Sequence, residues 1–254
     1  TFTMLYVNDG NGIFHQINTT IVGVYKGAAT WGDFDNDGLC DILITGYSFQ
    51  YGDVSKLYRN EGNGYFSEMT NSMIGISDGS CAAIDFNNDG FLDIILAGET
   101  SAGAITKIYM NDGYWNFTES NTGLVAVSNG SIDCGDLDND GFQDLLLTGD
   151  TGLGYVAIVY RNNAGMGFTD FNAGLLGVTN GSASWGDIDN DNDLDVVITG
   201  DTGSGIISKI YVFNGIVFSE LPTTLSGVRY SSTSWGDLNG DGYRDLLISG
   251  ESSN

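Results

Sequence analysis

The chain has 254 residues and a formal net charge of −25, from 33 acidic and 8 basic side chains. A surface this acidic repels phosphate backbones and anionic lipids, which argues against nucleic-acid binding and against a role on a membrane surface. Apolar residues make up 41% of the chain, enough for a folded core, and the 38 glycines are about twice the usual share, which indicates many tight turns.

Two markers recur from the beginning of the chain to its end. The first is a tyrosine, at Tyr6, Tyr58, Tyr109, Tyr160 and Tyr211, with intervals of 52, 51, 51 and 51 residues. The second is an acidic nonapeptide at 33–41, which returns every 50 to 52 residues, at 85–93, 136–144, 187–195 and 237–245. Self-similarity at a fixed period indicates a repeat architecture, here of five units.

The fourth copy shows the elements of one unit in order. Ser182–Trp185 is strand-like, the acidic loop follows, and the next apolar segments are 196–199, 206–212 and 217–219. Short apolar runs bounded by glycine are typical of buried strands. Four-stranded units of this length predict an all-β fold, a five-bladed β-propeller of four-stranded antiparallel blades. The period is too long for a β-helix and too short for tandem β-sandwiches.

The two ends of the chain lie out of phase with the repeat. Joining them keeps both markers within about two residues of their phase. We therefore expect a single domain over 1–254, a ring whose fifth blade combines residues 231–254 with 1–20. Residues 2–6 would then pair beside 246–248. The alternative is an excerpt from a ring of seven or eight blades, in which the N-terminal strands pair with a blade outside this chain.

Each acidic motif has the form D-x-[DN]-x-D-[GN]-x-x-D. Oxygen side chains at positions 1, 3 and 5 converge when such a loop curls, and position 7 can add a backbone carbonyl and position 9 a carboxylate. Hard oxygen ligands in a flexible loop favour Ca²⁺ over transition metals and over octahedral Mg²⁺. An Asx-rich turn without metal is the alternative, and it explains the Asn and Gly residues but not the repeated carboxylates.

Position 6 supports the metal loop independently, because only Gly and Asn readily adopt a left-handed backbone. This position is Gly38, Gly90, Gly141, Asn192 and Gly242. Three cysteines at unrelated spacings and a single histidine, by contrast, predict no zinc site.

The loop, the apolar strand after it and a later Tyr-x-Asn-x-Gly-x-Gly-x-Phe hairpin resemble the FG-GAP or VCBS repeat family over essentially the whole chain. That family includes the calcium-binding blades of integrin α-subunit propellers and a fungal lectin with related blades. The resemblance implies about five calcium ions, one in the loop between the first two strands of each blade. Integrin-type propellers usually have seven blades, so five is a departure from the family pattern.

Ligands are implied by carrying the family motif over position by position, with the position-7 residue acting through its backbone carbonyl. Asn87 and Asn239 lower the charge of the second and fifth loops. The implied ligands are Asp33, Asp35, Asp37, Leu39 and Asp41; Asp85, Asn87, Asp89, Phe91 and Asp93; Asp136, Asp138, Asp140, Phe142 and Asp144; Asp187, Asp189, Asp191, Asp193 and Asp195; and Asp237, Asn239, Asp241, Tyr243 and Asp245.

The function expected from these features is an extracellular binding or adhesion module, secreted or on the cell surface. We expect it to be a monomer with structural calcium and a protein or glycan ligand, and without membrane insertion. A lectin is the alternative, and a propeller domain of a larger secreted enzyme is the third reading. No nucleophile–base pair is visible in the sequence, so we expect no enzymatic activity.

Aromatic residues outside the motif fall into two groups. Trp31, Trp185 and Trp235 recur two residues before the loops, and we expect them to pack between blades. Trp115, in a hairpin turn, and the segment 48–51, an aromatic insertion peculiar to the first copy, are candidates for stacking on sugar rings. Turn variation and packing are the alternative explanations for both.

Overall fold

The computed structural model describes residues 1–252, and over these residues it contains twenty β-strands and no helix. Four sheets are complete, and each is an antiparallel meander of four consecutive strands. This confirms the predicted all-β fold and its four-stranded units. No helix of the described chain is long and apolar enough to cross a membrane.

The four complete sheets are numbered in chain order. Sheet 1 consists of β3 (Ala29–Gly32), β4 (Asp41–Ser48), β5 (Gly52–Asn60) and β6 (Phe66–Met69). Sheet 2 consists of β7 (Ser77–Ile84), β8 (Asp93–Thr100), β9 (Gly103–Asn111) and β10 (Phe117–Ser120). Sheet 3 consists of β11 (Ile132–Gly135), β12 (Asp144–Asp150), β13 (Tyr155–Asn162) and β14 (Phe168–Asp170). Sheet 4 consists of β15 (Thr179–Gly186), β16 (Asp195–Asp201), β17 (Ile206–Phe213) and β18 (Phe218–Leu221).

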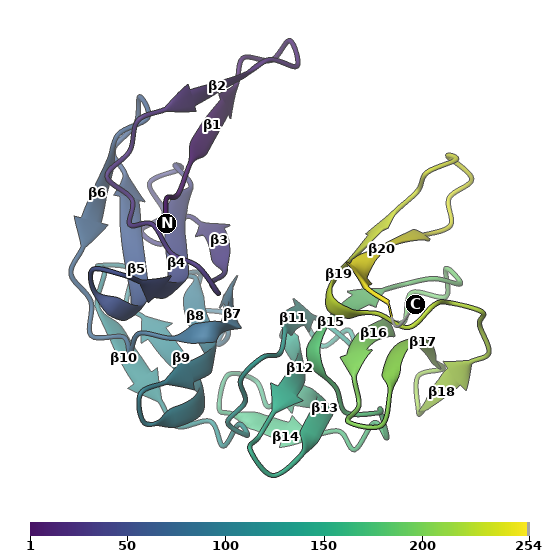
Figure 1. The fold of residues 1–254 in the computed structure, drawn as a ribbon. Coiled ribbons are helices and arrows are strands. Elements are labelled where there is room, and N and C mark those ends of the chain that lie inside the picture. The colour runs from purple at the N-terminus through teal and green to yellow at the C-terminus, as the bar shows by residue number, and fades with distance from the viewer. Residues whose placement is uncertain (253–254) are drawn as a thin grey trace.

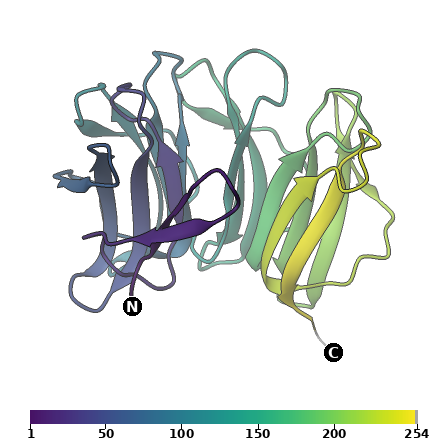
Figure 2. The same cartoon turned by 90° about the horizontal axis from the view of Figure 1, so that it is seen from above.

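Two further sheets have only two strands each. The N-terminal half-sheet is β1 (Leu5–Asn8) with β2 (Phe14–Ile17), and the C-terminal half-sheet is β19 (Arg229–Gly236) with β20 (Asp245–Glu251). Figure 1 shows the complete sheets along an open arc, with β1–β2 near one end and β19–β20 at the other, and Figure 2 shows the same arrangement from above.

The tyrosine marker occupies the same place in every complete sheet. Tyr109, for example, stands on the third strand opposite Ile94 on the second. Its hydroxyl accepts a hydrogen bond from the backbone N–H of Ile74, at 3.1 Å, in the segment that leads into the sheet. Equivalent bonds of 3.0 to 3.3 Å form at Tyr58, Tyr160 and Tyr211. A buried N–H needs an acceptor, which explains why the repeat uses tyrosine rather than phenylalanine.

The core lies between neighbouring sheets. Leu43 and Leu57 of sheet 1, for example, are fully buried and belong to one cluster with Ile94 and Leu96 of sheet 2. The second strand of each complete sheet is buried on both faces, as its continuous apolar run predicted. The first strands of neighbouring sheets contact one another along the arc. Just before β11, a Cβ atom on Gly130 would lie 1.7 Å from the carbonyl oxygen of Thr148 on β12 of the same sheet, so glycine is required at that position.

The predicted pairing of residues 2–6 beside 246–248 is not formed in this structure. Among the described residues, β1 pairs only with β2, and β20 pairs only with β19. The N-terminal segment is instead fixed to the segment that leads into sheet 1, because Thr1 Oγ1 donates to the carbonyl of Gly23 (3.1 Å) and Thr3 Oγ1 to that of Val22 (2.7 Å). The arc is open, and residues 253–254 of the predicted fifth blade lie outside the described residues.

Candidate metal centres

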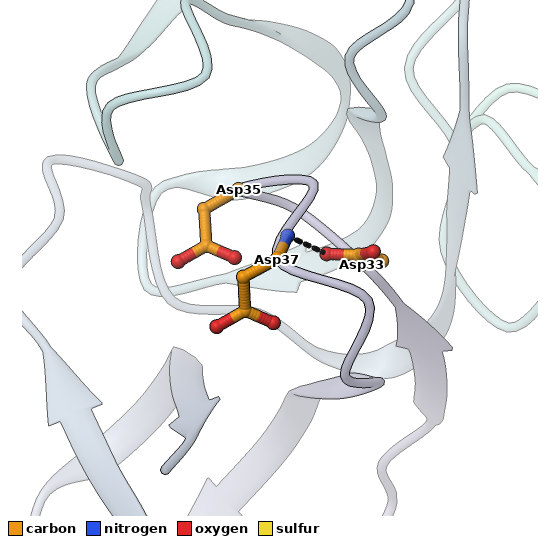
Figure 3. A group of neighbouring side chains, drawn as sticks. All are labelled: Asp33, Asp35 and Asp37. Atoms are coloured by element: carbon orange, nitrogen blue, oxygen red, sulfur yellow. Dashed lines mark hydrogen bonds between the residues drawn. The ribbon is translucent and has the colours of Figure 1, made fainter.

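The five acidic loops each join the first strand to the second strand of a sheet or half-sheet, and we number them sites 1 to 5 in chain order. In site 1 the Asp33 carboxylate accepts backbone N–H bonds from Asp37 (3.1 Å) and Gly38 (2.9 Å), and Asp37 Oδ1 accepts one from Leu39 (2.9 Å). Figure 3 shows the resulting curl and the three aspartates of the loop. The position-5 carboxylate accepts the same bond from position 7 in every site, at 2.8 to 2.9 Å.

Carboxylates converge in three of the five sites. One oxygen from each of three aspartates lies within 4.8 Å of the others in site 1 (Asp33, Asp35, Asp37), site 3 (Asp136, Asp138, Asp144) and site 4 (Asp187, Asp189, Asp195). In sites 2 and 5 position 3 is an asparagine, and the amides of Asn87 and Asn239 donate to the position-5 aspartates at 2.9 Å. Of the side-chain ligands predicted for sites 1, 3 and 4, Asp41, Asp140 and Asp191 lie outside these three-residue groups, and the predicted ligands of sites 2 and 5 form no such group.

The donor set fits a hard divalent cation. All the converging side-chain atoms are carboxylate oxygens, the ligands that calcium prefers. Among the described residues, Asp35 Oδ1 and Asp187 Oδ1 are buried and have no hydrogen-bond partner. A buried carboxylate oxygen without a partner is costly, and a bound cation would supply the missing interaction. These two atoms therefore favour the metal loop over a turn that holds no ion.

The position-9 aspartates also anchor the loops to the rest of their sheets. Asp93 is fully buried, and its two oxygens accept backbone N–H bonds from Phe86 in the loop (3.1 Å) and from Asn111 at the end of the third strand (2.7 Å). Burial raises the pKa of this carboxyl to about 6, and backbone hydrogen bonds oppose part of that shift. The pKa values of Asp41, Asp144 and Asp195 are raised to about 6 for the same reason.

Arg59, which the sequence reasoning missed, reaches into site 1 from β5. Its Nε donates to Asp35 Oδ2 at 2.7 Å, and its Nη2 donates to Asp37 Oδ2 at 2.9 Å. Arg161 stands in the same place in sheet 3, with Nε 3.4 Å from Asp138 Oδ2. Sites 2 and 4 have an apolar residue there, such as Met110. The signal was present in the sequence, because both arginines directly follow a tyrosine marker.

Trp115 belongs to site 1 and not to an exposed sugar-binding turn. Its ring is half-buried against Phe34, with centroids 6.4 Å apart, and its Nε1 donates to Asp35 Oδ2 at 3.2 Å. Of the two explanations considered for Trp115, these contacts favour packing over stacking on sugars. The side chain crosses from the β9–β10 turn of sheet 2 to the loop of sheet 1. This contact joins two different repeats, so the sequence of one repeat does not predict it.

Neighbouring loops are joined to each other by the asparagine at position 4. Asn36 Nδ2 donates to the carbonyl of Gly90 at 2.8 Å, Asn88 Nδ2 to that of Gly141 at 2.9 Å, and Asn190 Nδ2 to that of Gly242 at 3.0 Å. The sequence reasoning missed these residues, although asparagine occupies position 4 in the first four copies. These bonds link site 1 to site 2, site 2 to site 3 and site 4 to site 5, whereas among the described residues Asn139 makes no such bond between sites 3 and 4.

Comparison with protein families places four overlapping matches on the chain. A family described as "FG-GAP-like repeat" matches residues 33–96, 85–147, 136–198 and 187–248. A comparison with curated proteins finds no match. Among solved structures, the V. cholerae biofilm matrix protein Bap1 is similar over 83% of this chain and 41% of that chain, with 15% identity and a TM-score of 0.38.

Proposed function

This chain belongs to the family of FG-GAP-like repeat proteins, and we propose that it is a calcium-binding β-propeller that serves as an extracellular binding or adhesion module. In this proposal the acidic loops hold about five structural calcium ions, and the exposed surfaces of the ring bind a protein or a glycan. The proposed role is binding and not catalysis.

The observation that carries the calcium part is the convergence of carboxylates around buried oxygens without partners. In site 1 the residues that would hold an ion are Asp33, Asp35 and Asp37, together with the Leu39 carbonyl. Bound calcium would supply positive charge that neutralises the loop carboxylates. Because the position-4 asparagines join site 1 to site 2, site 2 to site 3 and site 4 to site 5, ordering one loop of such a pair also supports the other.

The test is a count of bound ions on protein that has been stripped with a chelator and reloaded with calcium. Native mass spectrometry is expected to show about five ions, and the Asp37→Ala variant one ion fewer, because position 5 supplies a ligand and little packing. A matched control is Asp112→Ala, which removes an exposed aspartate from a hairpin turn outside the loops. An unchanged count in Asp37→Ala would show that the ligand assignment is wrong.

Calcium removal is also expected to destabilise the fold. If a site has a Kd near ~10⁻⁵ M, millimolar calcium is about 100-fold above it and stabilises the folded state by roughly 2.7 kcal/mol per site. A melting temperature that does not change when bound calcium is shown to leave would contradict a structural role for the ion.

The proposed ring further requires that the two half-sheets together make one blade. Their surfaces are exposed where the equivalent surfaces of the complete sheets are buried. Leu247 on β20 is 71% exposed, whereas Leu43, Ile95, Leu146 and Val197, which hold the same place in β4, β8, β12 and β16, are fully buried. Exposed apolar strand faces favour association with another strand pair.

The tryptophans also support closure of the ring, by contact between the C-terminal half-sheet and sheet 1. A Cβ atom on Gly135 would lie 3.2 Å from the Trp185 ring of the next sheet, and one on Gly186 would lie 2.7 Å from Trp235 Nε1, so these tryptophans pack between sheets as expected. A Cβ atom on Gly236, the equivalent glycine of β19, would have no described atom within 4 Å apart from those of its chain neighbours, and Trp31 is 53% exposed. We infer that Trp31 packs on Gly236 when the ring is closed.

The hydrogen bonds expected in the closed ring can also form, with one exception. Asn8 holds the place of Asn111 on β9, whose backbone N–H bonds to the position-9 aspartate, so Asn8 would reach Asp245 in the closed ring. The exception is position 4 of the fifth loop. This residue is Gly240, which has no side chain to reach the loop of sheet 1, so the closed ring lacks there the bond that joins three of the other pairs of neighbouring loops.

A disulfide test separates the possible partners of β20. Thr3 and Ser249 face each other in the register of the complete sheets, so Thr3→Cys with Ser249→Cys is expected to oxidise to a crosslinked monomer in dilute solution. Thr3→Cys with Ile248→Cys, slipped by one residue, is the control, and both pairs carry Cys40→Ser because Cys40 is exposed. Crosslinked oligomers would show that β20 pairs with a second copy of the chain. The absence of any crosslink would contradict the proposed pairing of the two half-sheets.

A further inference from the structure

Sheet 1 carries a cluster of exposed aromatic side chains that the repeat does not explain. Phe49 and Tyr51, at the tip of the β4–β5 hairpin, are 75% and 56% exposed. This hairpin lies at the end of β4 opposite the acidic loop. The corresponding turns of sheets 2, 3 and 4, at 101–102, 151–154 and 202–205, contain no aromatic residue. The fold can therefore be built without these rings.

The cluster is held in place by its neighbours. Tyr25 stacks on Phe49 with ring centroids 5.2 Å apart and an interplanar angle of 29°, and Tyr47 lies 5.4 Å from Tyr25. The backbones of Tyr25 and Tyr47 exchange N–H···O bonds of 3.0 and 2.9 Å. The Phe49 ring is thus supported on one side while most of its surface remains open to solvent. A preorganised ring binds a ligand with less loss of conformational entropy.

A pocket of about 430 Å³ lies beside this cluster. It is lined by Phe49, Gln50 and Tyr51 from the hairpin, by Thr20 and its neighbours from the segment before β3, and by Glu68 from β6. The pocket therefore combines aromatic side chains with an amide, a hydroxyl and a carboxylate. These are groups that can stack on the C–H face of a sugar and form hydrogen bonds with its hydroxyls.

The charges around the pocket favour a neutral ligand. Glu68 accepts a hydrogen bond from Lys56 Nζ, so its charge is already balanced. The same Nζ lies 4.6 Å from the centroid of the Tyr51 ring, which is the position that a cationic ligand would take. A ligand anion would meet the overall net charge of −25.

We propose that this pocket is a subsite for a neutral pyranose, with Phe49 and Tyr51 as stacking residues and Gln50 and Glu68 as hydrogen-bonding residues. The subsite gives the binding module proposed above a class of ligand. It rests on that proposal only in assuming that the protein is a binding module. The pocket shares no residue with the acidic loops.

The experiment uses an array of neutral oligosaccharides, followed by titration of the strongest binder in solution. We expect Phe49→Ala and Tyr51→Ala each to weaken the affinity by roughly tenfold or more, the usual effect of truncating an aromatic residue at the centre of a binding site. The matched control is Tyr65→Ala, which removes a 74% exposed tyrosine from the β5–β6 turn, at the other end of sheet 1. Saturation-transfer NMR from the aromatic protons is expected to mark the sugar ring protons.

Three results would overturn the proposal: no neutral oligosaccharide bound, equal affinity in the Phe49→Ala and wild-type proteins, or binding of tetramethylammonium in place of sugars. Competition by free oligosaccharide against an immobilised glycoprotein distinguishes a soluble sugar from a protein-linked glycan. Absence of sugar binding with about five calcium ions bound would refute this site alone. Sugar binding in a protein that binds no calcium would instead refute the calcium proposal and leave this one standing.

Discussion

Replacing Arg59 by methionine is expected to strengthen calcium binding at site 1. The substitution copies the residue that sheet 2 has at the same place, Met110, so the strand tolerates it. In the structure the guanidinium holds Asp35 Oδ2 at 2.7 Å and Asp37 Oδ2 at 2.9 Å, and both aspartates are predicted calcium ligands. An incoming ion must therefore compete with a cation that is already present.

The size of the effect follows from these two bonds. A hydrogen bond to a charged group contributes roughly 1.5–3 kcal/mol, and exposure to solvent reduces that figure. The Arg59 side chain is 34% exposed and that of Asp35 only 10%, so solvent screens part of the competition and we expect a change in affinity of about tenfold. Without calcium, the same substitution leaves Asp35 and Asp37 without a counter-charge and is expected to lower the melting temperature.

The assay is a competition titration with a fluorescent calcium chelator, combined with thermal melts in the presence and absence of calcium. We expect one site to bind about tenfold more tightly in Arg59→Met, and the stabilisation by calcium to increase. Arg161→Met is the control, with a smaller expected effect because Arg161 makes one longer contact, of 3.4 Å. Weaker binding or the loss of one ion in Arg59→Met would refute the reasoning and show that Arg59 orients the ligands.

Three further predictions concern the buried groups. Calcium-free protein is expected to become more stable as the pH falls from 7 to 5. The position-9 carboxyls of sites 1 to 4 have a pKa of about 6 when folded, above their ordinary value. Their stabilising effect is therefore complete below about pH 4 and is lost as the pH rises through 6. Urea melts across that range test this, and a flat profile would contradict it. Asp93→Asn is expected to lower the free energy of unfolding by roughly 1–3 kcal/mol in the same assay, because one of two buried backbone N–H groups loses its acceptor. Asp112→Asn is the exposed control. Equal stability of the two variants would count against the anchoring role of Asp93. Tyr109→Phe is expected to cost roughly 1–2 kcal/mol, since it leaves the N–H of Ile74 without its partner, whereas Tyr65→Phe is expected to change the unfolding free energy little.

The amino-acid sequence by itself determined the features that depend on local chemistry and on periodicity. The four strands of each unit were predictable because apolar runs bounded by glycine recur at one period, and Ser182–Trp185 indeed lies within β15. The curl of the acidic loops was predictable too, because Asp33, Asp37 and Leu39 are joined by bonds between residues at most five apart in the chain.

Only the tertiary structure decided which residues meet across strands and sheets. Arg59 enters site 1 from 22 to 24 positions away, Trp115 reaches Asp35 over 80 positions, and Asn36 bonds to Gly90 over 54. These contacts depend on the angle at which one sheet packs on the next, which no local pattern encodes. Closure of the ring is of the same kind. The phase of the repeat predicts a register for the two half-sheets, but their pairing depends on a curvature summed over four sheets, and in this structure the arc remains open.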